Sequence, residues 1–296
     1  EALFLTLNAS SWVMSTVVPS ARMMGVGGGA AAAQSAALPA PRFSISIMTT
    51  IASALQLVHQ RIERACNAAA RPAAGVQLLA VSKTFGADAI LAAAEAGQRA
   101  FGENYIQEAV AKIAAVQAQA PQLARQLQWH CIGPIQSNKT RAVAEHFHWA
   151  HTIDRLKIAQ RLSEQRPAHL PPLQVCLQLN VDGGANKAGV PPEEARALAL
   201  AVAPLPRLQL RGVMSIPEPA ADFATQRALH LRAQAVWADI AALAQESSTP
   251  QAVKAGLAQW DTLSLGMTAD LEAAIAAGST LVRVGSGIFG ARAARG

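Results

Sequence analysis

The chain of 296 residues has few of the features that mark secreted, membrane or nucleic-acid-binding proteins. Its three cysteines (Cys66, Cys131 and Cys176) are odd in number and lack metal-ligand spacing, which favours a reduced, cytoplasmic protein. No segment reaches the roughly 18 apolar residues of a transmembrane helix. Only 4% of residues are aromatic, and the 25 lysines and arginines form no basic run. The net charge of +6 therefore suits small anions, with nucleic-acid binding the weaker alternative.

Residues 1–47 differ in composition from the rest of the chain. Their only charged residues are Glu1, Arg22 and Arg42, and glycine and alanine fill positions 27–33. We expect a disordered extension without function, with Met48 as the natural start. Residues 48–292 then form a single domain, followed by a short tail at 293–296. Hydrophobic residues make up 51% of the chain, enough to fill a sizeable core.

Apolar periodicity predicts one leading helix at 49–71, followed by eight strand–helix units. The predicted strands are 76–82, 100–103, 127–133, 149–153, 173–181, 208–216, 260–265 and 281–285. The predicted helices between them are 87–96, 104–119, 139–147, 154–165, 191–202, 222–246 and 269–277. Asp154 is expected to cap its helix, and a brief turn is expected at 288–289.

Eight such units are the number in a (β/α)8 TIM barrel. A doubly wound sheet is the competing fold, but no dinucleotide-binding glycine fingerprint follows the first strand. The barrel fold predicts that functional residues lie where strands end. The candidates at these positions are Lys83, Glu103, Asn104, His130, Asn180, Met214, Ser215, Ser264, Arg283, Gly285 and Ser286.

Lys83 is the most informative of these residues, because it ends the apolar strand at 76–82. A lysine there has two interpretations. Its ammonium can reach solvent, or burial can lower its pKa so that the neutral amine forms a Schiff base. The local sequence leaves both open.

The loops after the seventh and eighth strands are where barrels often bind phosphate. Gly285 allows close approach of the backbone to an anion, and the Ser286 hydroxyl can donate to it. Together with a lysine at a strand end, this combination suits pyridoxal 5'-phosphate (PLP). Arg283 can donate to a pyridine nitrogen while remaining charged. Its alternative is an inward-facing arginine paired with Glu103 or another carboxylate.

Five motifs in order resemble the YggS/PROSC family of pyridoxal phosphate homeostasis proteins over about 49–292. They are VSKT at 81–84, FGENYIQE at 101–108, WHCIGPIQSNK at 129–139, LSLGM at 263–267 and VRVGSGIFG at 282–290. The resemblance implies a single-domain barrel of the alanine-racemase N-terminal type (PLP fold type III). It further implies a PLP carrier without an established enzymatic activity, which buffers the cofactor or delivers it to apo-enzymes.

Roles follow from the resemblance by position. Lys83 would form the Schiff base, and Arg283 would bind the pyridine nitrogen. Gly285 and Ser286 would hold the phosphate, with Ser264 and Met267 beside them. Asn104 and His130 lie at matching strand ends with less defined roles, and a core position for His130 remains an equal alternative. We expect a monomer.

Two positions depart from the family pattern. Cys131 replaces an aromatic residue, which affects packing only. Gly184 replaces an acidic residue, which removes any carboxylate-based exchange role there. Lys187 remains as a possible second amine, although a solvated loop lysine is the simpler interpretation.

Two enzyme classes are alternatives to a carrier. A PLP-dependent racemase needs a second base, supplied in the resembling racemases by a tyrosine from an added β-domain. This chain has one tyrosine, Tyr105, early in the predicted barrel. A class I aldolase places its lysine later in the barrel and needs no arginine at a pyridine nitrogen. Both are therefore less favoured.

Overall fold

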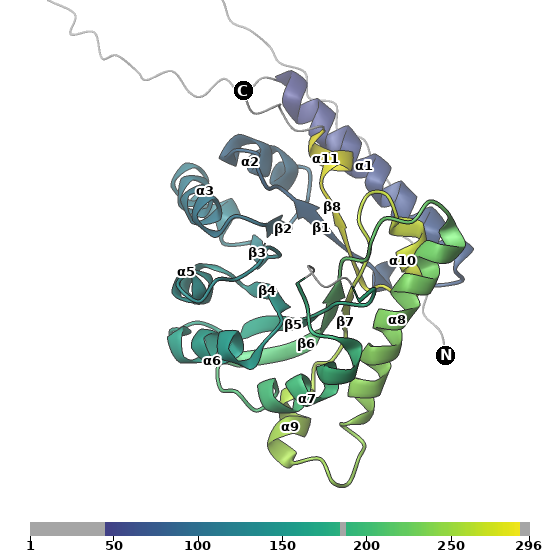
Figure 1. Ribbon diagram of the computed structural model, residues 1–296. Coiled ribbons are helices and arrows are strands. Elements are labelled where there is room, and N and C mark those ends of the chain that lie inside the picture. The colour runs from purple at the N-terminus through teal and green to yellow at the C-terminus, as the bar shows by residue number, and fades with distance from the viewer. Residues whose placement is uncertain (1–44, 184–187, 291–296) are drawn as a thin grey trace, which may run out of the picture. The chain divides into compact units, whose positions relative to one another are not determined.

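Eight parallel strands close into a barrel in the computed structural model, which describes residues 45–183 and 188–290 (Figure 1). Neighbours in sequence are neighbours in the sheet, and β8 pairs with β1 through partners such as Leu79 and Arg283. This confirms the predicted (β/α)8 fold. The strands are β1 (Gln77–Val81), β2 (Ala100–Glu103), β3 (Gln128–Cys131), β4 (Trp149–Ile153), β5 (Leu173–Leu179), β6 (Leu208–Ser215), β7 (Thr262–Ser264) and β8 (Leu281–Val284).

Helices surround the barrel (Figure 1). They are α1 (Ile45–Ala68), α2 (Ala87–Glu95), α3 (Ile106–Gln119), α4 (Pro121–Ala124), α5 (Thr140–His146), α6 (Leu156–Gln165), α7 (Pro192–Val202), α8 (Phe223–Ala242), α9 (Gln251–Gly256), α10 (Leu271–Ala276) and α11 (Ser286–Phe289), with a 3-10 turn η1 (Ala73–Gly75).

The strands are buried on both faces, as expected for parallel strands covered by helices. In β1, Leu78 and Ala80 belong to the large core shared with the helices. Leu79 and Val81 belong to a separate cluster with Ala100, Ile132 and Leu281. This alternation follows from the two-residue period of a strand, and it divides the core into an outer shell and a barrel interior.

The leading helix α1 packs against α2, α10 and α11 (Figure 1). Its predicted apolar face is buried: Ile51, Leu55, Val58, Ile62 and Cys66. The helix begins at Ile45, so the last three residues of the predicted disordered extension are helical. The remainder of that extension, at 1–44, lies outside the described residues, as does the whole predicted tail at 293–296.

Some predicted helix ends were wrong. Asp154 is not the N-cap of α6: that position is Arg155, and the two side chains form an ion pair at 2.8 Å. The predicted helix 222–246 ends at Ala242, although Asp222 caps it by accepting a hydrogen bond from the Thr225 amide at 2.8 Å. The short α4 and α9 were not predicted.

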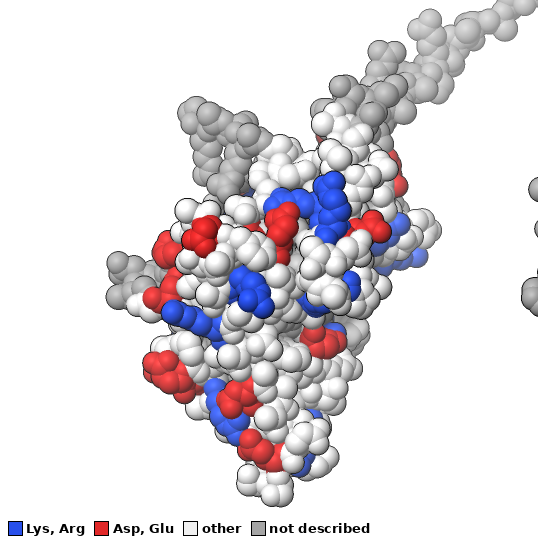
Figure 2. Space-filling view, turned by 90° about the vertical axis from the view of Figure 1, so that its right-hand side faces the viewer, with Lys and Arg blue, Asp and Glu red and all other residues white. Residues whose placement is uncertain are grey.

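Charged side chains of both signs are interspersed on the face shown in Figure 2, without a broad basic area on that face. Ion pairs in the described part of the chain include Arg61 with Glu272 and Arg196 with Glu246. Among the described residues, no helix has both the length and the apolarity needed to cross a bilayer.

Candidate functional site

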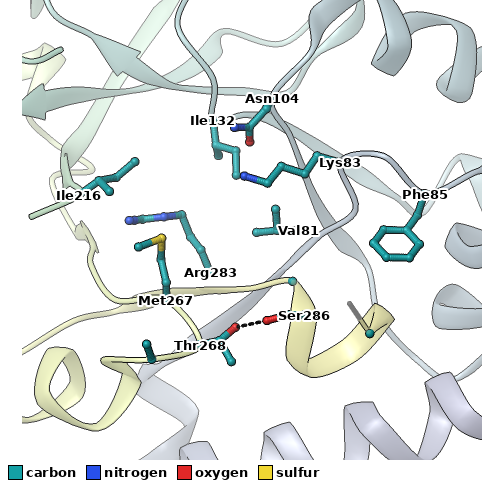
Figure 3. A pocket seen from close by; sticks show the side chains of 13 residues that line it. Val81, Lys83, Phe85, Asn104, Ile132, Ile216, Met267, Thr268, Arg283 and Ser286 are labelled. Atoms are coloured by element: carbon teal, nitrogen blue, oxygen red, sulfur yellow. Dashed lines mark hydrogen bonds between the residues drawn. The ribbon is translucent and has the colours of Figure 1, made fainter. Parts of the chain in front are cut away.

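A cavity of about 310 Å³ lies at the carboxyl ends of the strands, within the range of small-ligand pockets (Figure 3). It is at the end of the barrel where the sequence placed the site. Its walls come from the ends of β1, β2, β3, β6, β7 and β8. The lining residues are Val81, Lys83, Phe85, Asn104, Ile132, Ile216, Met267, Thr268, Ala269, Arg283, Gly285, Ser286 and Gly290.

Lys83 lies two residues beyond the end of β1, is half-buried and reaches into this cavity (Figure 3). It occupies a turn closed by the Phe85 amide, which donates to the Ser82 carbonyl at 3.1 Å. Thr84, the next residue, has φ 70°. A positive φ at the third position is a feature of a type II turn, where glycine is the usual residue. The amine therefore faces the cavity from a constrained backbone.

Arg283 lies within β8 and is 3% exposed, with its guanidinium directed into the same space (Figure 3). Its Nη1 donates to the Ser264 carbonyl at 2.7 Å and to the Ser264 hydroxyl at 2.8 Å, and Nη2 donates to the Ser215 carbonyl at 2.8 Å. These bonds use three of its five N–H groups. The remaining donors can serve a ligand.

The alternative pairing of Arg283 with Glu103 is wrong. Glu103 instead binds the Lys112 ammonium at 2.6 Å, away from the cavity lining. Burial lowers the pKa of Arg283 to about 10, so the guanidinium remains charged near neutrality. A buried cation bonded here to neutral oxygens is well suited to a polar, electron-rich ligand atom.

Ser264 and His130 do not line the cavity but belong to a buried chain beneath Arg283. The Ser264 hydroxyl lies 3.2 Å from His151 Nδ1, and His151 Nε2 lies 3.0 Å from His130 Nδ1. Both rings are fully buried, and His130 stacks on Trp149. Burial lowers the pKa of His151 to about 3 and that of His130 well below its usual value. Both are neutral, which avoids further positive charge beside Arg283.

Gly285 and Ser286 form the start of α11, where the sequence placed a phosphate loop. A Cβ at Gly285 would come within 3.1 Å of the Val81 carbonyl, so the two strand ends approach closely there. The Ser286 hydroxyl lies 3.5 Å from that of Thr268, which joins the β8 loop to the β7 loop (Figure 3). Met267 and Thr268 complete this side of the cavity.

The β7 loop is held by residues that the sequence did not indicate. Asp270 accepts from the Met267 amide at 2.6 Å and contacts His230 Nε2 at 2.9 Å. Burial alone would raise the pKa of Asp270, but these two hydrogen bonds and the nearby charges of His230 and Arg283 together lower it. Arg61 of α1 donates to the Thr268 carbonyl at 2.7 Å. Asp270 accepts from an amide three residues before it, the reverse of the direction in an Asx turn. Neither Asp270 nor Arg61 and His230 therefore gave a local signal.

The polar atoms around the cavity fit a phosphorylated pyridine aldehyde. An amine and a charged guanidinium share one cavity with a glycine–serine loop. Within the described residues, the buried Oδ1 atom of Asn104, a lining residue, has no hydrogen-bond partner, and buried polar atoms normally have one. Gly184 and Lys187 lie outside the described residues, so the expectations about them remain predictions.

The fold and these groups define a class: α/β barrels with a ligand site at the carboxyl ends of their strands. The family model of the alanine racemase N-terminal domain matches residues 54–293. A pyridoxal phosphate homeostasis protein of Pseudomonas aeruginosa is 54% identical over 245 residues, covering 83% of this chain and 97% of the relative.

Solved structures give the same result. The PipY protein of Synechococcus elongatus PCC7942 with PLP bound is 34% identical with a TM-score of 0.66, covering 81% of this chain and all of PipY. An alanine racemase of Corynebacterium glutamicum is only 17% identical with a TM-score of 0.55, and this chain covers 62% of it. That second likeness shows the fold alone. The chain belongs to the alanine racemase N-terminal domain family, and within it to the pyridoxal phosphate homeostasis proteins.

Proposed function

We propose that this protein binds PLP in the cavity, holds it as a Schiff base on Lys83, and stores or delivers it without catalytic turnover. The observation that carries the proposal is that Lys83, Arg283, Gly285 and Ser286 line one cavity. The relatives named for PLP homeostasis and the PLP-bound PipY structure support the choice of ligand.

The bound cofactor supplies an aldehyde that can be joined to a primary amine. Lys83, whose side chain reaches into the cavity, would hold the cofactor through its amine. Arg283 donates to the pyridine nitrogen but remains charged and does not protonate it. Gly285 and Ser286 bind the phosphate, with Met267 beside them. The Asn104 Oδ1 atom, which has no hydrogen-bond partner within the described residues, would accept a hydrogen bond from the same ligand. Ser264 supports Arg283 by accepting its hydrogen bonds, and His130 supports Ser264 through His151.

A carrier is favoured over a racemase because, among the described residues that line the cavity, none is placed as a second base opposite Lys83. The single tyrosine of the sequence, Tyr105, is 48% exposed and is not a lining residue. Arg283 does not separate the two classes, because the resembling racemases share the barrel, the lysine and the arginine. A class I aldolase would lack the visible absorbance of a bound pyridoxal imine.

The delivery part of the proposal implies partners and a compartment. The recipients would be apo-forms of PLP-dependent enzymes in the cytoplasm, and the protein would act as a monomer. Three buried cysteines without disulfides agree with a reducing compartment.

The experiment that tests this function measures solvent deuterium incorporation at Cα of alanine and serine. We expect the PLP-loaded protein to match free PLP, yet to transfer its cofactor to an apo-enzyme. Lys83-dependent exchange at about 1 s⁻¹ or faster, where ordinary enzymes begin, would favour the racemase. The Lys83→Ala variant is the control.

A further inference from the structure

A buried ion pair lies beside the turn that carries Lys83, outside the cavity lining. The side chains of Lys112 on α3 and Glu103 at the end of β2 are 4% and 0% exposed, and Lys112 Nζ lies 2.6 Å from Glu103 Oε1. Neither residue contributes to the cavity wall. Because desolvation offsets much of the attraction in a buried pair, such a pair is weak evidence for a purely stabilising role.

The contacts of this pair converge on the residue before Lys83. Lys112 Nζ donates to the Ser82 carbonyl at 2.9 Å, and the Ser82 hydroxyl donates to Glu103 Oε1 at 2.6 Å. The same Ser82 carbonyl also accepts from the Phe85 amide and closes the turn. Lys112 therefore fixes Ser82, the first residue of the turn, by a hydrogen bond to the Ser82 carbonyl oxygen.

The residue after Lys83 is held by the same network. The Thr84 amide donates to Glu108 Oε1 at 2.9 Å, and Glu108 lies 3.3 Å from Lys112 Nζ, one helical turn away on α3. Thr84 has φ 70°, a left-handed conformation that is unfavourable for a β-branched residue. Such backbone persists only where its surroundings impose it, and here Glu108 accepts the amide hydrogen.

Lys112 also favours the charged form of Glu103. Burial raises the pKa of Glu103, and the Lys112 ammonium opposes that shift. Its second oxygen, Oε2, has no hydrogen-bond partner within the described residues. Removing the Lys112 charge would therefore release Ser82, Glu103 and Glu108 together.

We propose that Lys112 is a positioning residue for Lys83: its ammonium fixes the backbone on both sides of Lys83 and thereby directs the amine into the cavity. This inference rests on the proposed function of Lys83 as the PLP-binding amine. It adds a residue that acts on the reaction without touching the cofactor.

The first test is Lys112→Met, which keeps the length of the side chain and removes the charge. We expect borohydride trapping of PLP on Lys83 to slow at least tenfold, while binding of pyridoxine 5'-phosphate, which has no aldehyde, stays within twofold of wild type. In the PLP-free protein, hydrogen exchange at the Thr84 amide should accelerate at least tenfold. If Lys112 contributed to stability alone, PLP trapping and pyridoxine 5'-phosphate binding would weaken together.

Two further variants cover the case in which Lys112→Met fails to fold. Glu103→Gln/Lys112→Met removes both charges, and Glu108→Gln leaves the buried pair intact while weakening the hold on Thr84. The double variant should show the full slowing, and Glu108→Gln a smaller one. Arg166→Met is the matched control, because Arg166 is an equally buried cation that donates to the carbonyls of Ala144 and Phe147. It should lower the melting temperature without slowing trapping.

The outcomes separate the two proposals. Wild-type trapping rates and a protected Thr84 amide in the double variant would overturn the positioning role, as would equal slowing in Arg166→Met. If wild-type protein itself fails to trap PLP on Lys83, the proposed function fails. Hydrogen exchange at the Thr84 amide then tests by itself whether Lys112 holds the turn.

Discussion

Arg283 contributes to both the ligand site and the barrel interior. Its guanidinium contacts the carbonyls of Ser215 and Ser264 from inside the barrel. It also lines the cavity with Lys83. Losing it should therefore affect binding and stability together.

We predict that Arg283→Met raises the PLP dissociation constant by about 10- to 100-fold, since a hydrogen bond from a charged donor contributes about 1.5–3 kcal/mol. Stability should fall by about 1–3 kcal/mol because buried carbonyls lose their donor. Absorbance titration and thermal unfolding measure the two effects. Arg211→Met is the control, since Arg211 lies over Trp149 and pairs with Asp261 outside this cavity. Unchanged affinity in Arg283→Met would contradict the assignment.

The buried histidines give a pH prediction. The pKa of His151 falls from its ordinary 6.5 to about 3 in the folded state through burial, with Arg283 adding to the shift. At a pH between these two pKa values, His151 is protonated in the unfolded chain but not in the folded chain. Stability therefore decreases as the pH drops below about 6.5, by about 1.4 kcal/mol per pH unit for one histidine.

Urea unfolding from pH 7 to pH 4.5 measures this slope. We expect His151→Gln to flatten it, although the substitution also lowers the plateau stability by disturbing the contact with Ser264. His146→Gln is the matched control, because that side chain is exposed in both states. An undiminished slope in His151→Gln would show that this ring is not the group responsible.

At the residue scale, position relative to a strand end was the informative signal. Lys83, Asn104, Arg283, Gly285 and Ser286 were chosen on that basis and line the cavity, as does Met267, which the family resemblance indicated. Four other candidates at strand ends do not line it: Glu103, Asn180, Met214 and Ser215. Ser264 and His130 were also chosen but point to the buried chain beneath Arg283. Lys112, Arg61 and His230 were missed, because each acts on a loop from a helix distant in sequence.

At the scale of elements, strands were easier to predict than helices. An apolar run with an abrupt end defines a buried strand, and β2 and β4 match their predicted bounds. The helix α9 has six residues and only Val253 buried, too few to show a period of 3.6. Asp154 was predicted as a cap from residue type alone, but its carboxylate pairs with Arg155.

The helix α1 supports a deletion prediction. Its first described buried side chain is Ile51, and it reaches the β7 loop through Arg61. A chain beginning at Met48 keeps all of these contacts. We expect its melting temperature to stay within about 2 °C of the full chain, which corresponds to about 0.5–1 kcal/mol for this size, with equal PLP content.

The contrast for this deletion is Arg61→Ala in the full chain. It should lower the melting temperature and weaken PLP binding, because Thr268 and Glu272 lose their contact with α1. A decrease of several degrees on deletion of residues 1–47 would show that the extension contributes to the fold.

At the scale of the whole molecule, eight repeated units sufficed to predict a closed barrel. What the sequence could not show is how the barrel interior is filled. Small apolar clusters share it with His130, His151, Ser264 and Arg283. These polar residues come from separate strands, and their pairing depends on barrel closure. The local sequence pattern therefore predicted the architecture, whereas the contacts that support the site could be identified only from the folded structure.

The central claim is that Lys83 holds PLP covalently, and its most direct test is borohydride reduction of the PLP-loaded protein followed by peptide mapping. The account predicts one equivalent of label on Lys83, and a folded Lys83→Ala protein that has lost the imine absorbance. Label on Lys187 or Lys112, or full absorbance in Lys83→Ala, would contradict it.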